Sequence, residues 1–217
     1  MIKKTLSSAL RRSAAGARLL TVRSLVLNGY LKDKGWIESV TRSMPVDANG
    51  QPIPWYTYGA IDFLADRIRA DMSVFEYGSG NSTLWWSSRT RRVVSCEHDE
   101  HWYAAMKSKV PANVAYEHVA LAADGTYAST VLRQAEKFDV IVIDGRDRVN
   151  CTKASLAALT QDGSIVFDNS DRSDYESAYA FLRANDFKRL DFWGMGPINN
   201  YGWCTSVFYR SRNCFGI

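Results

Sequence analysis

The sequence predicts an α/β protein with a doubly wound, mostly parallel sheet of seven strands that ends in an antiparallel hairpin. Two observations lead to this fold class. Between residues 59 and 185, short apolar runs alternate with segments of helical spacing, which is typical of parallel strands connected by helices that cover both faces of a sheet. After residue 186, two strand-like runs follow one another without a helix between them, which indicates a hairpin.

Apolar runs bounded by polar or glycine-containing turns define the predicted strands. They span residues 72–76, 92–97, 114–121, 138–144, 163–168, 187–192 and 204–210. The run at 138–144 is the most apolar in the chain. Because the first five strands belong to strand–helix repeats and the last two form the hairpin, the predicted sheet is Rossmann-like.

Apolar residues at helical spacing between these strands predict the helices. They span residues 59–70, 82–90, 101–110, 128–135, 151–160 and 173–185. The first helix places Ile61 and Leu64 on one face. Ser82 or Thr83 is expected to cap the second helix at its N-terminus, and Pro111 is expected to end the third.

Charge divides the chain into a basic extension, residues 1–58, and one domain, residues 59–217. The whole chain has 27 bases and 23 acids, a net charge of +4, and six of the bases lie within residues 2–27, a segment without acids. Without these six, 21 bases face 23 acids, so the rest of the chain is nearly neutral. A general nucleic-acid-binding surface is therefore not expected. The extension is expected to be helical and irregular.

Residues 2–27 are basic, free of acids and rich in leucine. This composition is compatible with an organelle-targeting segment, a helix in peripheral contact with a membrane, or a helix packed on the domain. No run is long and apolar enough to span a membrane. Four scattered cysteines do not form a disulfide framework or a zinc motif, so a reducing, cytoplasmic location is the simplest expectation.

A glycine turn follows the first predicted strand of the domain. Gly78 and Gly80 are separated by one residue, which lets the backbone approach a ligand closely. Glu76 precedes the turn, and Glu97 ends the next strand, 21 positions later. An acid at the tip of that strand is where a ribose would present its hydroxyls. The pattern predicts a site for a cofactor that contains a nucleoside.

The details of the turn favour one cofactor class. A dinucleotide site has glycine or alanine at the sixth position of its fingerprint, where this chain has Thr83. Glu76 would repel a pyrophosphate but attract an ammonium group. The run Glu76-Tyr77-Gly78-Ser79-Gly80 resembles the first motif of class I S-adenosylmethionine-dependent methyltransferases. The resemblance covers residues 60–217 and includes the terminal hairpin.

The resemblance implies roles for residues at the strand ends. Gly78 and Gly80 would face the methionine part of S-adenosylmethionine, with Glu76 near its amino group, and Glu97 would bind the ribose. His98 would flank the adenine. The expected cofactor-binding set is Glu76, Gly78, Gly80, Ser82, Glu97, His98, Asp124 and Asp144.

A second constellation consists of Asp144 at the end of one strand and Asp168 with Asn169 at the end of the next. These oxygen ligands suit Mg²⁺, and they resemble the metal site of the catechol- and caffeoyl-coenzyme-A-type O-methyltransferases. In that family a lysine follows the first aspartate by three residues, where this chain has Asp147. Asp144 and Asp168 are the predicted catalytic residues. The alternative is that residues 168–171 cap the following helix.

The function implied is methyl transfer from S-adenosylmethionine to the hydroxyl of a small-molecule acceptor, with or without Mg²⁺. The site loops carry Arg146, Arg148 and Arg172, which could bind an acceptor carboxylate or phosphate. Two alternatives stay open: a non-catalytic subunit that binds the cofactor and a partner, and a nicotinamide-dependent oxidoreductase.

Overall fold

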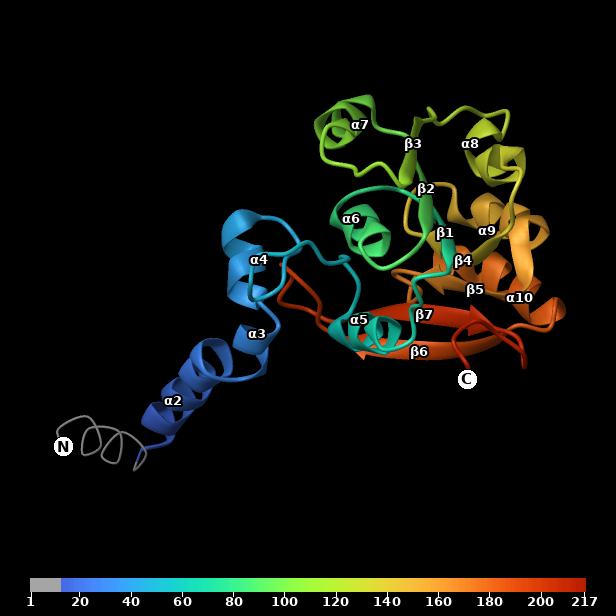
Figure 1. The fold of residues 1–217 in the computed structure, drawn as a ribbon. Coiled ribbons are helices and arrows are strands. Elements are labelled where there is room, and N and C mark those ends of the chain that lie inside the picture. The colour runs from blue at the N-terminus through green and yellow to red at the C-terminus, as the bar shows by residue number, and fades with distance from the viewer. Residues whose placement is uncertain (1–12) are drawn as a thin grey trace.

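The computed structural model of the chain describes residues 13–217, and its centre is a seven-stranded sheet with the order β3-β2-β1-β4-β5-β7-β6 (Figure 1). The strands are β1 (Ser73–Tyr77), β2 (Arg92–Glu97), β3 (Val114–His118), β4 (Phe138–Ile143), β5 (Leu159–Phe167), β6 (Lys188–Gly194) and β7 (Trp203–Tyr209). Strands β1 to β5 pair in parallel, whereas β7 is antiparallel to both β5 and β6. The predicted fold class is confirmed.

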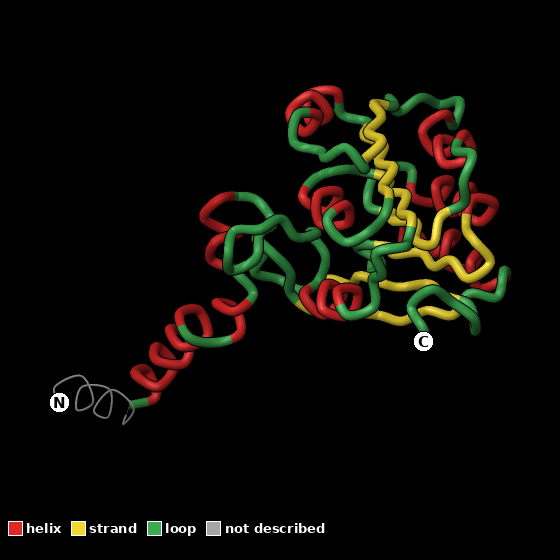
Figure 2. The backbone as a smooth tube through the Cα atoms, in the orientation of Figure 1, coloured by secondary structure: helices red, strands yellow, loops and turns green. Residues whose placement is uncertain are grey.

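Helices cover both faces of this sheet (Figure 2). They are α5 (Tyr58–Ala65), α6 (Asn81–Ser87), α7 (Glu100–Lys107), α8 (Thr126–Ser129), η1 (Thr130–Arg133), α9 (Arg148–Ala158), η2 (Ser173–Tyr175) and α10 (Glu176–Ala184). Neighbouring strand residues point to opposite faces and therefore enter different cores. Val74 packs with Trp86 of α6, while Phe75 belongs to the core that contains Tyr179 of α10.

Some element boundaries differ from the predicted ones for local reasons. Helix α6 has Gly80 as its N-cap rather than Ser82 or Thr83. Thr83 lies inside the first turn, where its hydroxyl accepts a 3.1 Å hydrogen bond from the Gly80 N–H. Helix α9 begins at Arg148, earlier than the predicted residue 151, because a turn closes there after β4.

The N-terminal extension is more helical than its prolines and glycines suggest. It contains α2 (Ala14–Leu27), α3 (Tyr30–Asp33) and α4 (Trp36–Arg42). Helix α2 extends away from the sheet (Figure 1), and its Leu19 and Val22 side chains are 62% and 60% exposed. Residues 1–12, with four of the six early bases, lie outside the described residues. None of the helices from residue 13 onward is long and apolar enough to cross a membrane.

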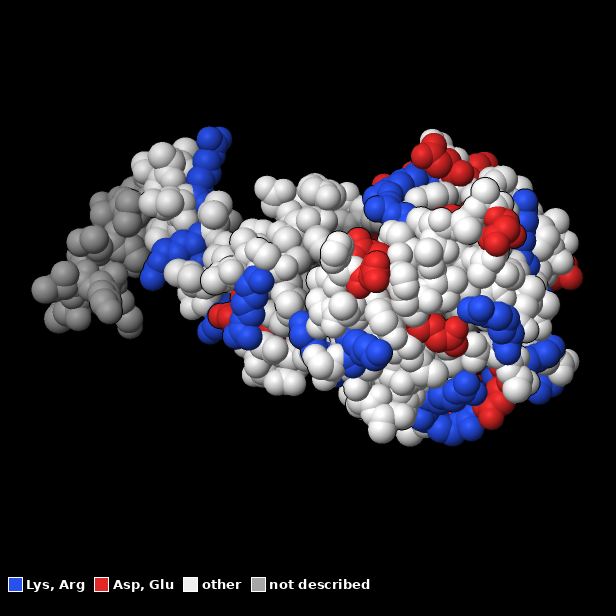
Figure 3. Space-filling view, turned by 90° about the horizontal axis from the view of Figure 1, so that it is seen from above, with Lys and Arg blue, Asp and Glu red and all other residues white. Residues whose placement is uncertain are grey.

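The later part of the extension is bound to the hairpin. Trp36 Nε1 donates to the Asn199 carbonyl at 2.9 Å, and the Tyr58 N–H donates to the Met195 carbonyl at 2.8 Å. Thr57 donates through its hydroxyl to the Phe192 carbonyl at 3.0 Å. These bonds hold the segment before α5 beside the loop between β6 and β7. On the face drawn in Figure 3, basic and acidic residues are interspersed over the domain.

Candidate active site

Two loops cross closely at the carboxyl ends of β1 and β4. Gly78 has a φ of +92°, and a Cβ on it would lie 3.1 Å from the Gly145 nitrogen. A Cβ on Gly145 would lie 2.1 Å from the Tyr127 hydroxyl oxygen. Both glycines are therefore required by the close approach of backbone to backbone and to Tyr127. By contrast, a Cβ on Gly80 would meet only the Trp102 ring, at 3.7 Å.

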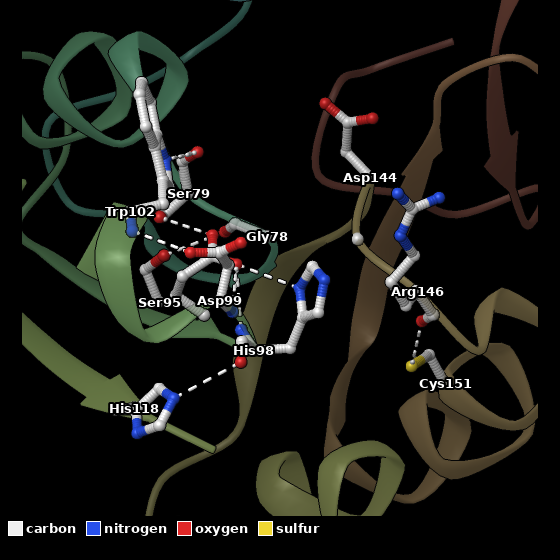
Figure 4. A network of polar contacts seen from close by, with 12 residues as sticks. Gly78, Ser79, Ser95, His98, Asp99, Trp102, His118, Asp144, Arg146 and Cys151 are labelled. Carbon is white, nitrogen blue, oxygen red and sulfur yellow. Dashed lines mark hydrogen bonds and ion pairs between the residues drawn. The ribbon is translucent and has the colours of Figure 1, made fainter. Parts of the chain in front are cut away.

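A pocket of about 490 Å³ lies beside this crossing. Its lining comes from the loops after β1, β2, β4 and β5: Gly78, Ser79, Glu97, His98, Asp99, Trp102, Asp144, Gly145, Arg146, Arg148, Asn169 and Arg172. Figure 4 shows the glycine turn, His98 and Trp102 on one side and Asp144 and Arg146 on the other. The volume is within the range of small-molecule sites.

Glu97 is fixed in this pocket by hydrogen bonds to both carboxylate oxygens. Oε1 accepts from the backbone N–H groups of His98 at 2.8 Å and Asp99 at 3.0 Å. Oε2 accepts from the Ser79 hydroxyl at 2.7 Å. His98 Nδ1 also lies 2.9 Å from Oε1. Because Oε2 has only the Ser79 donor among the described residues and a carboxylate oxygen can accept about two hydrogen bonds, Oε2 keeps capacity for a ligand hydroxyl.

Aromatic side chains border the same region. Trp102 Nε1 donates to the Ser79 carbonyl at 2.9 Å, which holds the indole over the glycine turn. The His98 ring lies edge-on to Tyr127, with ring centres 6.1 Å apart. These positions are suited to enclosing a flat ring such as an adenine.

Glu76 is buried beneath the glycine turn and does not line the pocket. Its Oε2 accepts from the hydroxyls of Thr83 at 2.5 Å and Ser95 at 3.2 Å, whereas Oε1 is buried without a partner in the described part of the chain. Burial raises the pKa of Glu76 to about 7, against the hydrogen bonds of Ser82 and Thr83, which lower it. The side chain supports the turn from below.

Three other residues of the expected cofactor set also lie outside the lining: Gly80, Ser82 and Asp124. Ser82 is buried within α6. Asp124 lies before α8, where its Oδ1 accepts from the Thr126 N–H at 2.9 Å. The structure brings together Gly78, Glu97, His98 and Asp144 from that set.

A second pocket, of about 340 Å³, adjoins the first. It is lined by Trp55, Asp144, Asp168, Asn169, Arg172, Asn199, Tyr201 and Trp203. Asp144, Asn169 and Arg172 line both pockets, so these three residues mark where the two meet. Asn169 has a φ of +50°, a left-handed conformation that asparagine tolerates better than most residues and that turns the chain sharply after β5.

Asp168 is held at the buried end of the smaller pocket, with 3% of its surface exposed. Its Oδ1 accepts from Trp203 Nε1 at 2.9 Å and from the Thr205 hydroxyl at 2.5 Å, while Oδ2 makes no hydrogen bond within residues 13–217. Burial, and then the charge of Asp144, raise the pKa of Asp168 to about 7. Burial also raises the pKa of Asp144, although Arg148 opposes this effect.

Arg148 connects the ends of β4 and β5 through a buried guanidinium. It forms an ion pair with Asp144 Oδ1 at 3.0 Å and donates to the carbonyls of Asp144, Gly145 and Asp168. It therefore supplies a positive charge beside the acidic strand ends. The sequence pattern groups Arg148 with Arg146 and Arg172 as loop arginines, since nothing in it indicates that the Arg148 side chain turns inward.

The predicted Mg²⁺ set of Asp144, Asp168 and Asn169 does share one pocket. However, Asp144 is already neutralised by Arg148, and Asp168 Oδ1 is occupied by Trp203 and Thr205. No group of three His, Cys, Asp or Glu residues among those described is placed to hold a metal. One oxygen of each carboxylate is therefore engaged, whereas Asp168 Oδ2 has no partner within residues 13–217, so the Mg²⁺ site stays a prediction. The helix-cap alternative is wrong, because Asp171 accepts from the Cys204 N–H and η2 has no side-chain cap.

The sequence alone did not single out several residues of the two pockets. Thr205 and Asn199 carry no motif, and Ser79 was noted only as a member of the glycine turn. Trp55 belongs to an aromatic run beside prolines, which was the one available signal. Its neighbour Tyr56 is fully buried, whereas Trp55 is 43% exposed at the smaller pocket.

No protein-family model and no curated protein matches this sequence. Solved structures do match the fold. A Klebsiella pneumoniae protein provisionally described as an O-methyltransferase is 15% identical, with a TM-score of 0.55 over 89% of this chain and 96% of its own. Precorrin-6y C5,15-methyltransferase from Geobacter metallireducens is 17% identical, with a TM-score of 0.54 over 70% and 87%.

A third structure was determined with a ligand. It is a Streptococcus mutans protein, provisionally described as a methyltransferase, in complex with S-adenosylhomocysteine (SAH). It is 14% identical, with a TM-score of 0.51 over 68% of this chain and 94% of its own. Together with the strand order and the terminal hairpin, these likenesses show that the chain has the fold of the class I S-adenosylmethionine-dependent methyltransferases.

Proposed function

We propose that this protein transfers a methyl group from S-adenosylmethionine to the hydroxyl of a small-molecule acceptor. The observation that carries the proposal is the junction of two pockets at Asp144, Asn169 and Arg172. One pocket contains the glycine turn and Glu97; the other ends at Asp168. Such an arrangement lets two ligands meet at one boundary with their reacting atoms side by side.

The residues of the larger pocket suit the parts of S-adenosylmethionine. Glu97 would accept the ribose hydroxyls, Trp102 and His98 would enclose the adenine, and the turn at Gly78 would face the methionine part. When bound, this co-substrate supplies an electrophilic methyl group, whose bond to sulfur breaks as the acceptor oxygen bonds to its carbon.

Asp168 would take the proton of the acceptor hydroxyl. Its Oδ2 has no partner among the described residues and its side chain lines the smaller pocket. Trp203 and Thr205 fix the carboxylate through Oδ1, so Oδ2 keeps a constant orientation. A carboxylate with a pKa near neutrality is a more effective proton acceptor than an ordinary aspartate.

Calorimetric titration with S-adenosylmethionine tests the proposal. We expect the parent protein to bind it and Glu97→Ala to bind it about 10- to 100-fold more weakly, since a hydrogen bond to a charged group contributes about 1.5–3 kcal/mol. Methyl transfer is then measured with labelled co-substrate and a panel of hydroxylated acceptors. Absence of binding by the parent protein contradicts the proposal.

Two alternatives predict other results. A nicotinamide-dependent oxidoreductase would bind NADH or NADPH in the same titration. A non-catalytic partner subunit would bind S-adenosylmethionine yet form no methylated product with any acceptor. Exposed Leu19 and Val22 on α2 keep the second alternative open, because they form an apolar surface away from the sheet.

A further inference from the structure

The smaller pocket contains three polar side chains whose hydrogen-bonding groups are uncommitted. Asn169, Arg172 and Asn199 all line it, and none makes a side-chain hydrogen bond or ion pair within residues 13–217. Two amides supply both donors and acceptors, and the guanidinium supplies donors and a positive charge. A ligand that completes this pocket therefore needs several polar groups.

Arg172 differs from the two other arginines of the site. Arg148 is buried and donates to three backbone carbonyls and to Asp144. Arg146 lines only the larger pocket. Arg172 alone combines exposure, absence of an ion pair within the described chain and a place in the smaller pocket. It is the cation available to an anionic acceptor.

Aromatic faces border the same pocket. Trp55 and Tyr201 are 43% and 61% exposed, and Trp203 is buried with its Nε1 bonded to Asp168. The Tyr201 and Trp203 rings lie 6.1 Å apart at 60°. Exposed aromatic faces beside polar side chains can pack on the apolar face of a ring while its substituents reach the polar groups.

The lining of the smaller pocket differs between its buried and exposed residues. Asp168 and Trp203 lie at its buried end, whereas Arg172 and Tyr201 lie at its exposed end. Asp144 and Arg172 both lie where the two pockets meet, so Arg172 is the positive group that an anionic substituent contacts there when an acceptor hydroxyl lies at Asp168. A guanidinium binds a carboxylate or a phosphate in a bidentate manner.

We infer that the acceptor is a polyhydroxylated ring with an anionic substituent, that is, a sugar acid or a sugar phosphate. The ring lies between Trp55 and Tyr201, the anion contacts Arg172, and neighbouring hydroxyls contact Asn169 and Asn199. A simple phenol would leave both amides without partners, which disfavours it. Methyl transfer to a ring hydroxyl rests on the proposed function. Binding of the ring in the smaller pocket does not depend on that function.

Binding of matched neutral and anionic compounds tests the inference without requiring methyl transfer. The probes are glucose with glucuronate, galactose with galacturonate, glucose with glucose 6-phosphate, and phenol with 4-hydroxybenzoate. Each is titrated by ligand-observed NMR, with and without S-adenosylhomocysteine. We expect at least one sugar acid or sugar phosphate to bind about tenfold or more tightly than its neutral partner. Comparison of the sugar carboxylates with the sugar phosphate then shows which anion the pocket prefers.

Four variants then show which side chains bind the anionic group and the ring. Arg172→Gln should remove the preference for the anion and leave the affinity for the neutral partner within about twofold, whereas Arg183→Gln on α10 should change neither. Trp55→Ala should weaken binding of both members of the pair. Trp193→Ala is the matched control, because Trp193 is 67% exposed but does not line the pocket.

Three results overturn the inference: no anionic sugar binds better than its neutral partner, the phenols bind best, or Arg172→Gln weakens S-adenosylmethionine and not the acceptor. The last result would assign Arg172 to the co-substrate carboxylate. Failure of the proposed function is separate, because it shows as absence of S-adenosylmethionine binding by the parent protein while the sugar titrations still report on the smaller pocket.

Discussion

The indole of Trp203 donates a 2.9 Å hydrogen bond to Asp168 Oδ1, which links the first residue of the last strand to the acid that follows β5. This bond, with that of Thr205, favours the ionised carboxylate and opposes the burial that raises its pKa. The proton acceptor of the proposed reaction is thus adjusted by a strand that is distant in sequence.

Removing one of these bonds should move the pH dependence of methyl transfer. The pKa of Asp168 is about 7, so the rate should rise with pH through that value as the carboxylate ionises. In Thr205→Val the carboxylate loses a donor, its pKa rises, and the rising limb should shift upward by about one pH unit. The pH profile of kcat measures this; an unchanged profile would show that Asp168 is not the base.

Asp168→Asn should lower kcat by about 10²- to 10⁴-fold, since it removes the proton acceptor. The affinity for S-adenosylmethionine should change little, because Asp168 does not line the larger pocket. Single-turnover rates and calorimetry separate the two effects. An equal loss of cofactor binding and rate would instead indicate general damage to the site.

The pair of the buried Arg148 and the partly buried Asp144 should matter more to stability than an exposed surface pair. Arg148→Met leaves the partly buried Asp144 and three carbonyls without their donor, and we expect a loss toward the lower end of the about 3–5 kcal/mol of unfolding free energy that breaking a buried pair costs. Arg183→Met is the matched control, because its pair with Glu176 is exposed and contributes about 0.2–1 kcal/mol. Urea unfolding compares them, and equal losses would contradict the assigned role.

The same pair predicts that the parent enzyme does not depend on Mg²⁺. With Arg148 already beside Asp144, a chelator should leave methyl transfer unchanged and added Mg²⁺ should not increase it. Loss of activity with the chelator, restored by Mg²⁺, would support the magnesium site predicted from sequence.

Glu76 should make stability depend on pH in the absence of cofactor. Its pKa is raised by burial to about 7 in the folded protein, above the ordinary value of 4.5. The folded state therefore holds the proton more tightly, so this contribution is fully present below about pH 4.5 and is lost as pH rises through about 7.

Glu76→Gln keeps the shape of the side chain and removes this titration. Relative to the parent protein, the variant should gain about 3 kcal/mol of unfolding free energy between pH 4.5 and pH 8. Denaturant unfolding of both proteins at the two pH values gives the difference. A difference that does not change with pH would show that Glu76 is ionised throughout.

The parts of the fold that depend on apolar periodicity were predictable. The runs ending at Glu97 and Asp144 gave both the strands and the edge at which the pockets lie. The Trp203–Asp168 bond was not predictable, because it joins residues that only the antiparallel return of β7 brings together. The inward turn of Arg148 was likewise hidden, since its acceptors are mostly backbone carbonyls that carry no sequence signal. The position of Asp124 outside the pocket lining was not predictable, because loop conformation does not follow from strand periodicity.

Trp55 comes from the segment before the first helix of the domain, yet it forms a wall of the smaller pocket. The larger pocket takes no residue from that segment. Changes there can therefore alter which molecule is accepted while leaving the glycine turn and Glu97 untouched. We therefore expect acceptor choice to change through substitutions in the segment before α5, without any change in the sheet or in the larger pocket.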